Sequence, residues 1–108
     1  MSRVIDELYE VILDRKANPA EGSYTSYLFA QGLDKILKKC GEELSEVIIA
    51  AKNGGGDQLG AELGDLLYHL LVLMAETGLT TDDLYTLLEE RRKKTGNLKP
   101  ARQTDRET

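Results

Sequence analysis

The sequence has little of what several protein classes require. It contains one cysteine, no tryptophan, one phenylalanine and two prolines among 108 residues. A lone cysteine cannot build a disulfide framework, so we expect a reduced, cytoplasmic protein with Cys40 in its core. No apolar run approaches the roughly 18 residues of a membrane span, and the first residues do not resemble a signal peptide. We therefore expect no membrane association.

Positive charge is scarce in most of the chain. Residues 1–90 hold 7 Lys and Arg against 17 Asp and Glu, whereas residues 91–108 hold 7 against 2. A segment as acidic as residues 1–90 is expected to repel nucleic acid, but it can still bind phosphates through a divalent cation. We expect a single domain over residues 1–96 and a polar, disordered tail over residues 97–108. A domain of this size buries a modest share of its surface, which favours oligomerisation.

Apolar residues at helical spacing predict an all-α fold that resembles an antiparallel four-helix bundle. The four helices are expected from Ser2 to Asn18-Pro19, from Leu33 to the glycine turn at 54–56, from Gln58 to Thr77 and from Thr80 to about Thr95. Asp57 is predicted to cap the third, and Thr80 with Asp83 forms a capping-box pattern at the fourth.

Residues 18–26 form the longest irregular segment inside the predicted fold, followed by a short helical turn over residues 27–31 that Gly32 closes. Turn formers and hydroxyl side chains dominate this segment. Long ordered loops with polar tips often carry binding residues, so we predict that it belongs to the functional site.

The third long helix is apolar nearly all round and is therefore expected to be buried on most sides. Its polar side chains nevertheless fall within one arc of about 60° at 100° per residue, without a Lys or Arg among them. They are Gln58, Glu62, Asp65, His69 and Glu76. This narrow polar line is not typical of a solvent-facing surface.

Two carboxylate pairs on the neighbouring second and third helices predict a metal site. Glu43 and Glu46 lie one turn apart, as do Glu62 and Asp65, and the glycine turn brings the two pairs together. Four acidic groups crowded near a helical interior repel one another unless a cation is present. We therefore predict a Mg²⁺ site, with Mn²⁺ as an alternative, because carboxylate oxygens suit hard cations.

Carboxylate-bound cations commonly serve phosphate chemistry with water as the nucleophile. Glu42 lies beside the predicted ligands and is a candidate to orient or deprotonate that water, while Lys39 can offset charge on a leaving pyrophosphate. His69 fits a hydrogen-bonding or substrate-contacting role better than that of a metal ligand. Lys35 is a further candidate substrate contact on the same face as Lys39.

The spacing Glu42-Glu43-x-x-Glu46 followed by Glu62-x-x-Asp65 resembles the signature of the MazG-like all-α nucleotide pyrophosphohydrolases. Further stretches are similar in order and spacing to one family among them, the phosphoribosyl-ATP pyrophosphatases. These stretches are Arg15-Lys16, residues 22–25, residues 32–36, residues 39–43, residues 50–53 and residues 65–69. The similarity covers roughly residues 4–92.

The resemblance implies a homodimer with its site between subunits. It also implies hydrolysis of phosphoribosyl-ATP to phosphoribosyl-AMP and pyrophosphate, the second step of histidine biosynthesis. The implied roles are metal binding by Glu43, Glu46, Glu62 and Asp65, water activation by Glu42, and phosphate or ribose contacts from Arg15, Lys16, Ser23, Tyr24 and Thr25.

Three alternatives remain at this point. A MazG-like house-cleaning enzyme would share the fold and chemistry but hydrolyse ordinary or damaged nucleoside triphosphates. A di-iron bundle needs Glu-x-x-His pairs, and His69 does not have that spacing from Glu62 or Asp65. A non-catalytic helical interaction module would use the acidic faces only for solubility.

Overall fold

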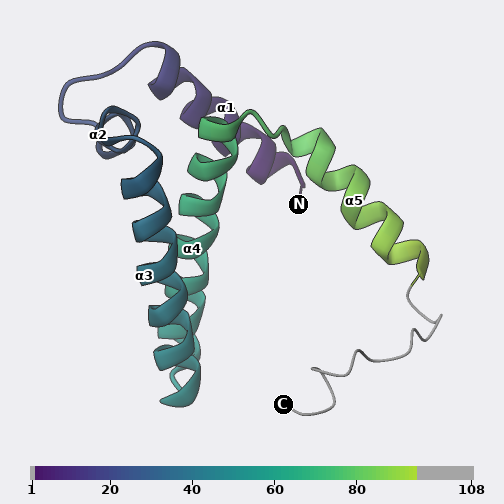
Figure 1. Ribbon diagram of the computed structural model, residues 1–108. Coiled ribbons are helices and arrows are strands. Elements are labelled where there is room, and N and C mark those ends of the chain that lie inside the picture. The colour runs from purple at the N-terminus through teal and green to yellow at the C-terminus, as the bar shows by residue number, and fades with distance from the viewer. Residues whose placement is uncertain (1, 95–108) are drawn as a thin grey trace.

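The computed structural model describes residues 2–94, and all of the regular structure across this range is helical (Figure 1). The helices are α1 (Ser2–Ala17), α2 (Tyr24–Gln31), α3 (Leu33–Lys52), α4 (Gly56–Thr77) and α5 (Thr81–Lys94). The all-α prediction is confirmed, and the four long helices occupy the expected parts of the chain. The predicted tail at 97–108 lies outside the described residues.

α3 and α4 form an antiparallel hairpin and lie side by side along their length (Figure 1). The turn between them uses Gly54 at φ 77°, a left-handed conformation that favours glycine. The prediction that Asp57 caps α4 is wrong. The N-cap is Gly55, which supplies no side-chain hydrogen bond, and Asp57 lies inside the first turn, where its charge still favours the positive end of the helix.

α1 packs across the C-terminal half of α4 and closes the core there. Tyr9 and Ile12 of α1 pack with Leu71 and Val72 of α4, and Ile12, Leu71 and Val72 are fully buried. The Tyr9 hydroxyl also donates a 2.6 Å hydrogen bond to the carbonyl of Leu79, just beyond the end of α4. This packing fixes the end of α1 that leads into the 18–23 loop.

α2 begins three residues before the expected helical turn, because Ser23 caps it. The backbone N–H of Ser26 donates to Ser23 Oγ at 3.1 Å. Ser26 in turn donates through its hydroxyl to the carbonyl of Arg15 and accepts from the N–H of Ala20, both at 3.1 Å. These bonds tie the start of α2 to the end of α1 and leave a shorter loop than predicted.

α5 extends away from the α3–α4 hairpin (Figure 1). Its predicted capping box is confirmed: Asp83 N–H donates to Thr80 Oγ1 at 3.0 Å, and Thr80 N–H donates to the Asp83 carboxylate at 3.1 Å. The Thr80 backbone N–H lowers the pKa of the Asp83 carboxyl most, and the Thr80 side chain lowers it further. None of the described α5 residues is buried, although Leu84 packs on the core and the Tyr85 hydroxyl donates to Asp6 at 2.8 Å.

The expectation that α4 is buried on most sides is wrong for the single chain. Leu63, Leu67 and Leu70 are 48%, 40% and 38% exposed, and α3 exposes Leu37, Leu44 and Ile48. We call these six exposed residues of α3 and α4 the apolar ridge. Within the described residues, no helix combines the length and apolarity needed to cross a membrane.

Replacing Ile12 with Ala should destabilise the fold by about 2–4 kcal/mol, because it leaves a cavity in a fully buried site. Val11→Ala is the matched control, since Val11 is 49% exposed, and should cost less than about 1 kcal/mol. Urea unfolding at one protein concentration measures both. Equal losses would contradict the position of the core.

Candidate metal centre

Three carboxylates converge where α3 packs against α4. Glu43 of α3 and Glu62 and Asp65 of α4 each present an oxygen, and these oxygens lie within 4.8 Å of one another. Glu43 and Glu62 are partly buried, and Asp65 is exposed at the edge. Hard oxygen donors from two helices at this spacing suit a Mg²⁺-type cation, whose remaining positions are commonly filled by water or phosphate.

The electrostatic repulsion within this cluster is evident in the raised pKa of Glu62. Burial raises its pKa first, and the negative charges of Glu46, Asp65 and Glu43 raise it further. Glu46 is exposed and does not belong to the group with oxygens within 4.8 Å among the described residues, but its charge still reaches Glu62. Of the four predicted ligands, three thus converge in one group, and Glu46 lies outside it.

Lys39 connects the two glutamates at the edge of the cluster. Its ammonium lies 3.2 Å from Glu42 Oε1 and 3.8 Å from Glu43 Oε1. The hydrogen bond to Glu42 is the main cause of its raised pKa, although burial opposes it, so this cation is held in its charged form. Glu42 itself is about half exposed, which leaves its carboxylate accessible to water.

The beginning of α2 reaches α4 beside this cluster. The Tyr24 hydroxyl and His69 Nε2 lie 2.9 Å apart, and His69 Nδ1 lies 2.7 Å from the backbone carbonyl oxygen of Asp65. Thr25, next along α2, hydrogen-bonds the hydroxyl of Tyr68. Two adjacent α2 residues therefore contact two adjacent α4 residues one turn after Asp65.

The other predicted substrate contacts lie in different surroundings. Arg15 pairs with Asp14 at 2.9 Å and lies near enough to Tyr68 to lower that phenol's pKa, against the larger effect of burial. Lys16 donates at 2.9 Å to the carbonyl of Ala75 at the other end of α4. Lys35 is partly exposed, one turn before Lys39 on α3.

Cys40 was predicted to be a core residue, and it does pack against the core. Its thiol donates to the carbonyl of His69 at 3.4 Å, and burial raises its pKa, so the reactive thiolate is disfavoured. Two neighbours of the site were not among the predicted site residues, Ser26 and Tyr68. The Ser23-x-x-Ser26 spacing is a helix N-cap signal that would have indicated Ser26.

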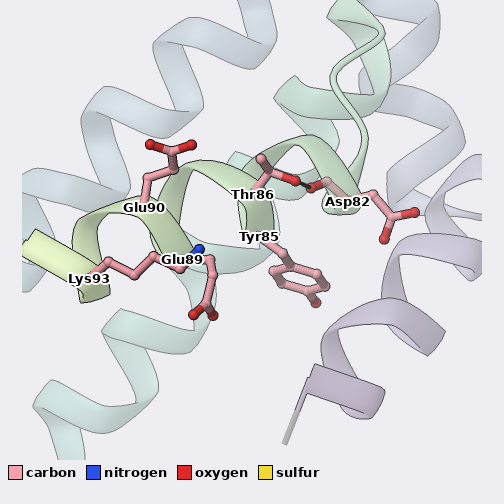
Figure 2. Close-up of a pocket in the computed structure, with 6 residues that line it drawn as sticks. All are labelled: Asp82, Tyr85, Thr86, Glu89, Glu90 and Lys93. Atoms are coloured by element: carbon pink, nitrogen blue, oxygen red, sulfur yellow. Dashed lines mark hydrogen bonds between the residues drawn. The ribbon is translucent and has the colours of Figure 1, made fainter.

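A hollow of about 390 Å³ lies elsewhere, along α5 (Figure 2). Its lining residues are Asp82, Tyr85, Thr86, Glu89, Glu90 and Lys93. They come from a single exposed helix, and none belongs to the carboxylate cluster or to the predicted site residues. The hollow therefore does not coincide with the site that the sequence predicts.

Comparison with known proteins identifies one family. Residues 5–92 match the family described as phosphoribosyl-ATP pyrophosphohydrolase. A phosphoribosyl-ATP pyrophosphatase of Clostridium novyi (strain NT) is 59% identical over 99 residues, covering 92% of this chain and 90% of that protein. One from Pelotomaculum thermopropionicum is 60% identical over 91 residues, covering 84% and 93%. A histidine biosynthesis bifunctional protein of Caldanaerobacter subterraneus subsp. tengcongensis is 55% identical over 91 residues, covering 84% of this chain and 44% of that protein.

Replacing Glu62 with Gln should raise the melting temperature of the protein in chelator at neutral pH. The folded state raises the pKa of Glu62, so its ionised form costs stability above that pKa, and the cost disappears as the pH falls through it. The gain of the variant over the wild type should therefore vanish in acid. Mg²⁺ should stabilise the wild type more than the variant.

Thermal melts across pH, with and without Mg²⁺, measure these differences. Glu90→Gln on exposed α5 is the control and should change neither the melting temperature in chelator nor the effect of Mg²⁺. A lower melting temperature for Glu62→Gln in chelator would contradict the proposed repulsion.

Proposed function

Because the chain belongs to the phosphoribosyl-ATP pyrophosphohydrolase family, we propose that it hydrolyses phosphoribosyl-ATP to phosphoribosyl-AMP and pyrophosphate, the second step of histidine biosynthesis, in the cytoplasm. The observation that carries this proposal is the convergence of Glu43, Glu62 and Asp65 in a chain matched to the family over residues 5–92. A non-catalytic module would have no reason to keep three mutually repelling carboxylates together.

Glu43, Glu62 and Asp65 would hold the cation, with Glu46 as a candidate fourth ligand, and the expected ion is Mg²⁺. The fit rests on the donor set, which is entirely carboxylate oxygen, and on the repulsion at Glu62 that a cation would relieve. When bound, Mg²⁺ neutralises phosphate charge and lowers the pKa of a coordinated water. Mn²⁺ is expected to substitute for it.

Glu42 and Lys39 have separate roles in the reaction: Glu42 accepts a proton, and Lys39 stabilises negative charge. The exposed carboxylate of Glu42 accepts a proton from the attacking water as the bond to the α-phosphorus forms. The bond from that phosphorus to the bridging oxygen breaks, and pyrophosphate leaves. Lys39 stays protonated, and its ammonium offsets the charge that develops on the departing pyrophosphate.

The residues around α2 contribute to substrate binding in two ways. Arg15 and Lys35 are at least partly exposed and can contact phosphate or ribose directly. Ser23 and Thr25 use their hydroxyls to cap α2 and to pair with Tyr68, so they shape the binding loop. Lys16 lies over the ring of Phe29 in α2 and donates to the carbonyl of Ala75 near the end of α4. It therefore supports the same region.

The protein is proposed to function as a homodimer, because the apolar ridge is too extensive to remain in water. On a helical projection, the ridge residues of α3 and α4 both lie about 100° round from the line along which the helices meet. In an antiparallel pair, equal rotations place both sets on the same side of the hairpin. A second copy packed on this side would bury all six residues.

Wild-type protein should release pyrophosphate from phosphoribosyl-ATP only when a divalent cation is present. Asp65→Asn should lower kcat more than about a hundredfold. Changing a residue that only hydrogen-bonds a metal ligand typically costs about 10–100-fold in activity, and losing the ligand itself should cost more. Glu42→Gln should lower kcat by about 10²–10⁴-fold with little change in Mg²⁺ dependence.

Asp57→Asn is the matched control for this experiment, since it removes a carboxylate from α4 two turns before Asp65 and outside the cluster. It should keep wild-type turnover. Faster hydrolysis of an ordinary dNTP than of phosphoribosyl-ATP would contradict the proposed substrate, and unchanged turnover in Asp65→Asn would contradict the metal centre.

Leu67→Lys should convert the dimer to a monomer, because it places a charge in the middle of the apolar ridge. Val4→Lys changes a valine of α1 that is 68% exposed and lies off the ridge, and should leave the dimer intact. Sedimentation velocity at micromolar protein measures both. A monomeric wild type, or dimers in both variants, would contradict the proposed interface.

A further inference from the structure

His69 is buried next to the metal centre and has both ring nitrogens occupied. Its residue surface is 6% exposed, which leaves it poorly placed to meet a substrate. Nδ1 lies 2.7 Å from the backbone carbonyl oxygen of Asp65, and Nε2 lies 2.9 Å from the Tyr24 hydroxyl. The ring therefore bridges the helix that carries a metal ligand and the loop that leads into α2.

Packing fixes the orientation of this ring. Tyr24 and Tyr68 each meet it edge to face, with centroids 5.7 Å away and interplanar angles of 74° and 79°. The backbone carbonyl of His69 accepts a hydrogen bond from the Cys40 thiol of α3 at 3.4 Å. Side chains from α2 and α4 thus hold the imidazole, and Cys40 of α3 contacts the backbone of the same residue.

The hydrogen bonds determine which atom donates. A carbonyl oxygen can only accept, so Nδ1 must carry a proton, and in the neutral ring Nε2 is then an acceptor. The Tyr24 hydroxyl therefore donates a hydrogen bond to Nε2. Its oxygen keeps two lone pairs, and these are the groups that Tyr24 can offer to other donors.

Tyr24 lies within electrostatic reach of the catalytic edge of the site. Burial raises the pKa of its phenol, the Lys39 ammonium lowers it, and the carboxylates of Glu43 and Glu42 raise it. The hydroxyl is held inward by His69 although 46% of the residue remains exposed. The Tyr24 oxygen therefore lies within electrostatic reach of the Lys39 ammonium.

We propose that His69 is a positioning residue, which fixes the Tyr24 hydroxyl by the hydrogen bond at Nε2, and that the Tyr24 oxygen in turn orients the Lys39 ammonium for the reaction. This proposal rests on the proposed hydrolase function. It assigns His69 no contact with the substrate, in contrast to the prediction from the sequence. It also explains why α2 must be fixed so firmly to α1 and α4.

Steady-state kinetics of four variants test the proposal. Tyr24→Phe removes the oxygen and should lower kcat about tenfold while changing KM less than about twofold, since one positioned hydrogen bond is lost. His69→Asn keeps a donor near Nδ1 but removes the acceptor for Tyr24, and should match Tyr24→Phe. His69→Gln places an amide oxygen near the Nε2 position and should keep at least about a third of wild-type kcat.

The double variant Tyr24→Phe/His69→Asn should be no slower than either single variant, because both changes remove the same bond. Tyr27→Phe is the matched control. It removes the hydroxyl of a neighbouring α2 tyrosine of equal exposure, whose ring packs against Tyr24, and should retain wild-type kcat. Multiplying losses in the double variant, or equal losses in His69→Gln and His69→Asn, would overturn the proposal.

A second measurement does not depend on turnover. His69 is the only histidine in the chain, so long-range ¹H–¹⁵N NMR spectra give one imidazole pattern. The full-length protein with Mg²⁺ at mildly alkaline pH should show the proton on Nδ1, and Tyr24→Phe should shift Nε2 while leaving Nδ1 nearly unchanged. A proton on Nε2, or an unchanged Nε2 signal, would overturn the proposal even if the enzyme prefers another substrate.

Discussion

Repulsion among carboxylates on the inner edge of the α3–α4 hairpin is the constraint on which the rest of this structure depends. Glu43, Glu62 and Asp65 bring like charges within 4.8 Å, and the pKa of Glu62 is raised as a result. Removing this repulsion would be easy for a protein that needed only a stable hairpin, since a Gln at position 62 would serve. A divalent cation would make the same arrangement favourable, and a bound cation would serve phosphate chemistry. The repulsion in the absence of a cation is therefore explained by the proposed function.

The remaining elements hold other groups around this point. α1 packs on the far half of α4 and positions the loop, Ser23 and Ser26 fasten the start of α2, and Tyr24 then meets His69 one turn beyond Asp65. The core that supports this arrangement is small, and the apolar ridge stays outside it. In the proposed dimer, the second copy would supply the burial that a single chain of this length lacks.

The sequence predicted the parts of the fold and site that depend on local periodicity. The spacing of Glu43, Glu62 and Asp65 followed from helical geometry and one glycine turn, and the Thr80–Asp83 capping box followed from residue types alone. The early start of α2 follows from the local Ser23 cap, whereas the burial of Thr25 and Ser26 depends on contacts with α4 and α1, which are distant in sequence. Periodicity also could not show whether an apolar face meets its own chain or another, so Leu63, Leu67 and Leu70 were wrongly expected to be buried in the single chain.

The most direct test of the central claim is to locate the cation. Crystals of the full-length protein grown or soaked with Mn²⁺ allow its position to be found by anomalous scattering, independently of any substrate. We predict a peak bonded to oxygens of Glu43, Glu62 and Asp65, which disappears in Asp65→Asn. Well-ordered side chains at this cluster without a peak between them, or a peak held by other residues, would contradict it.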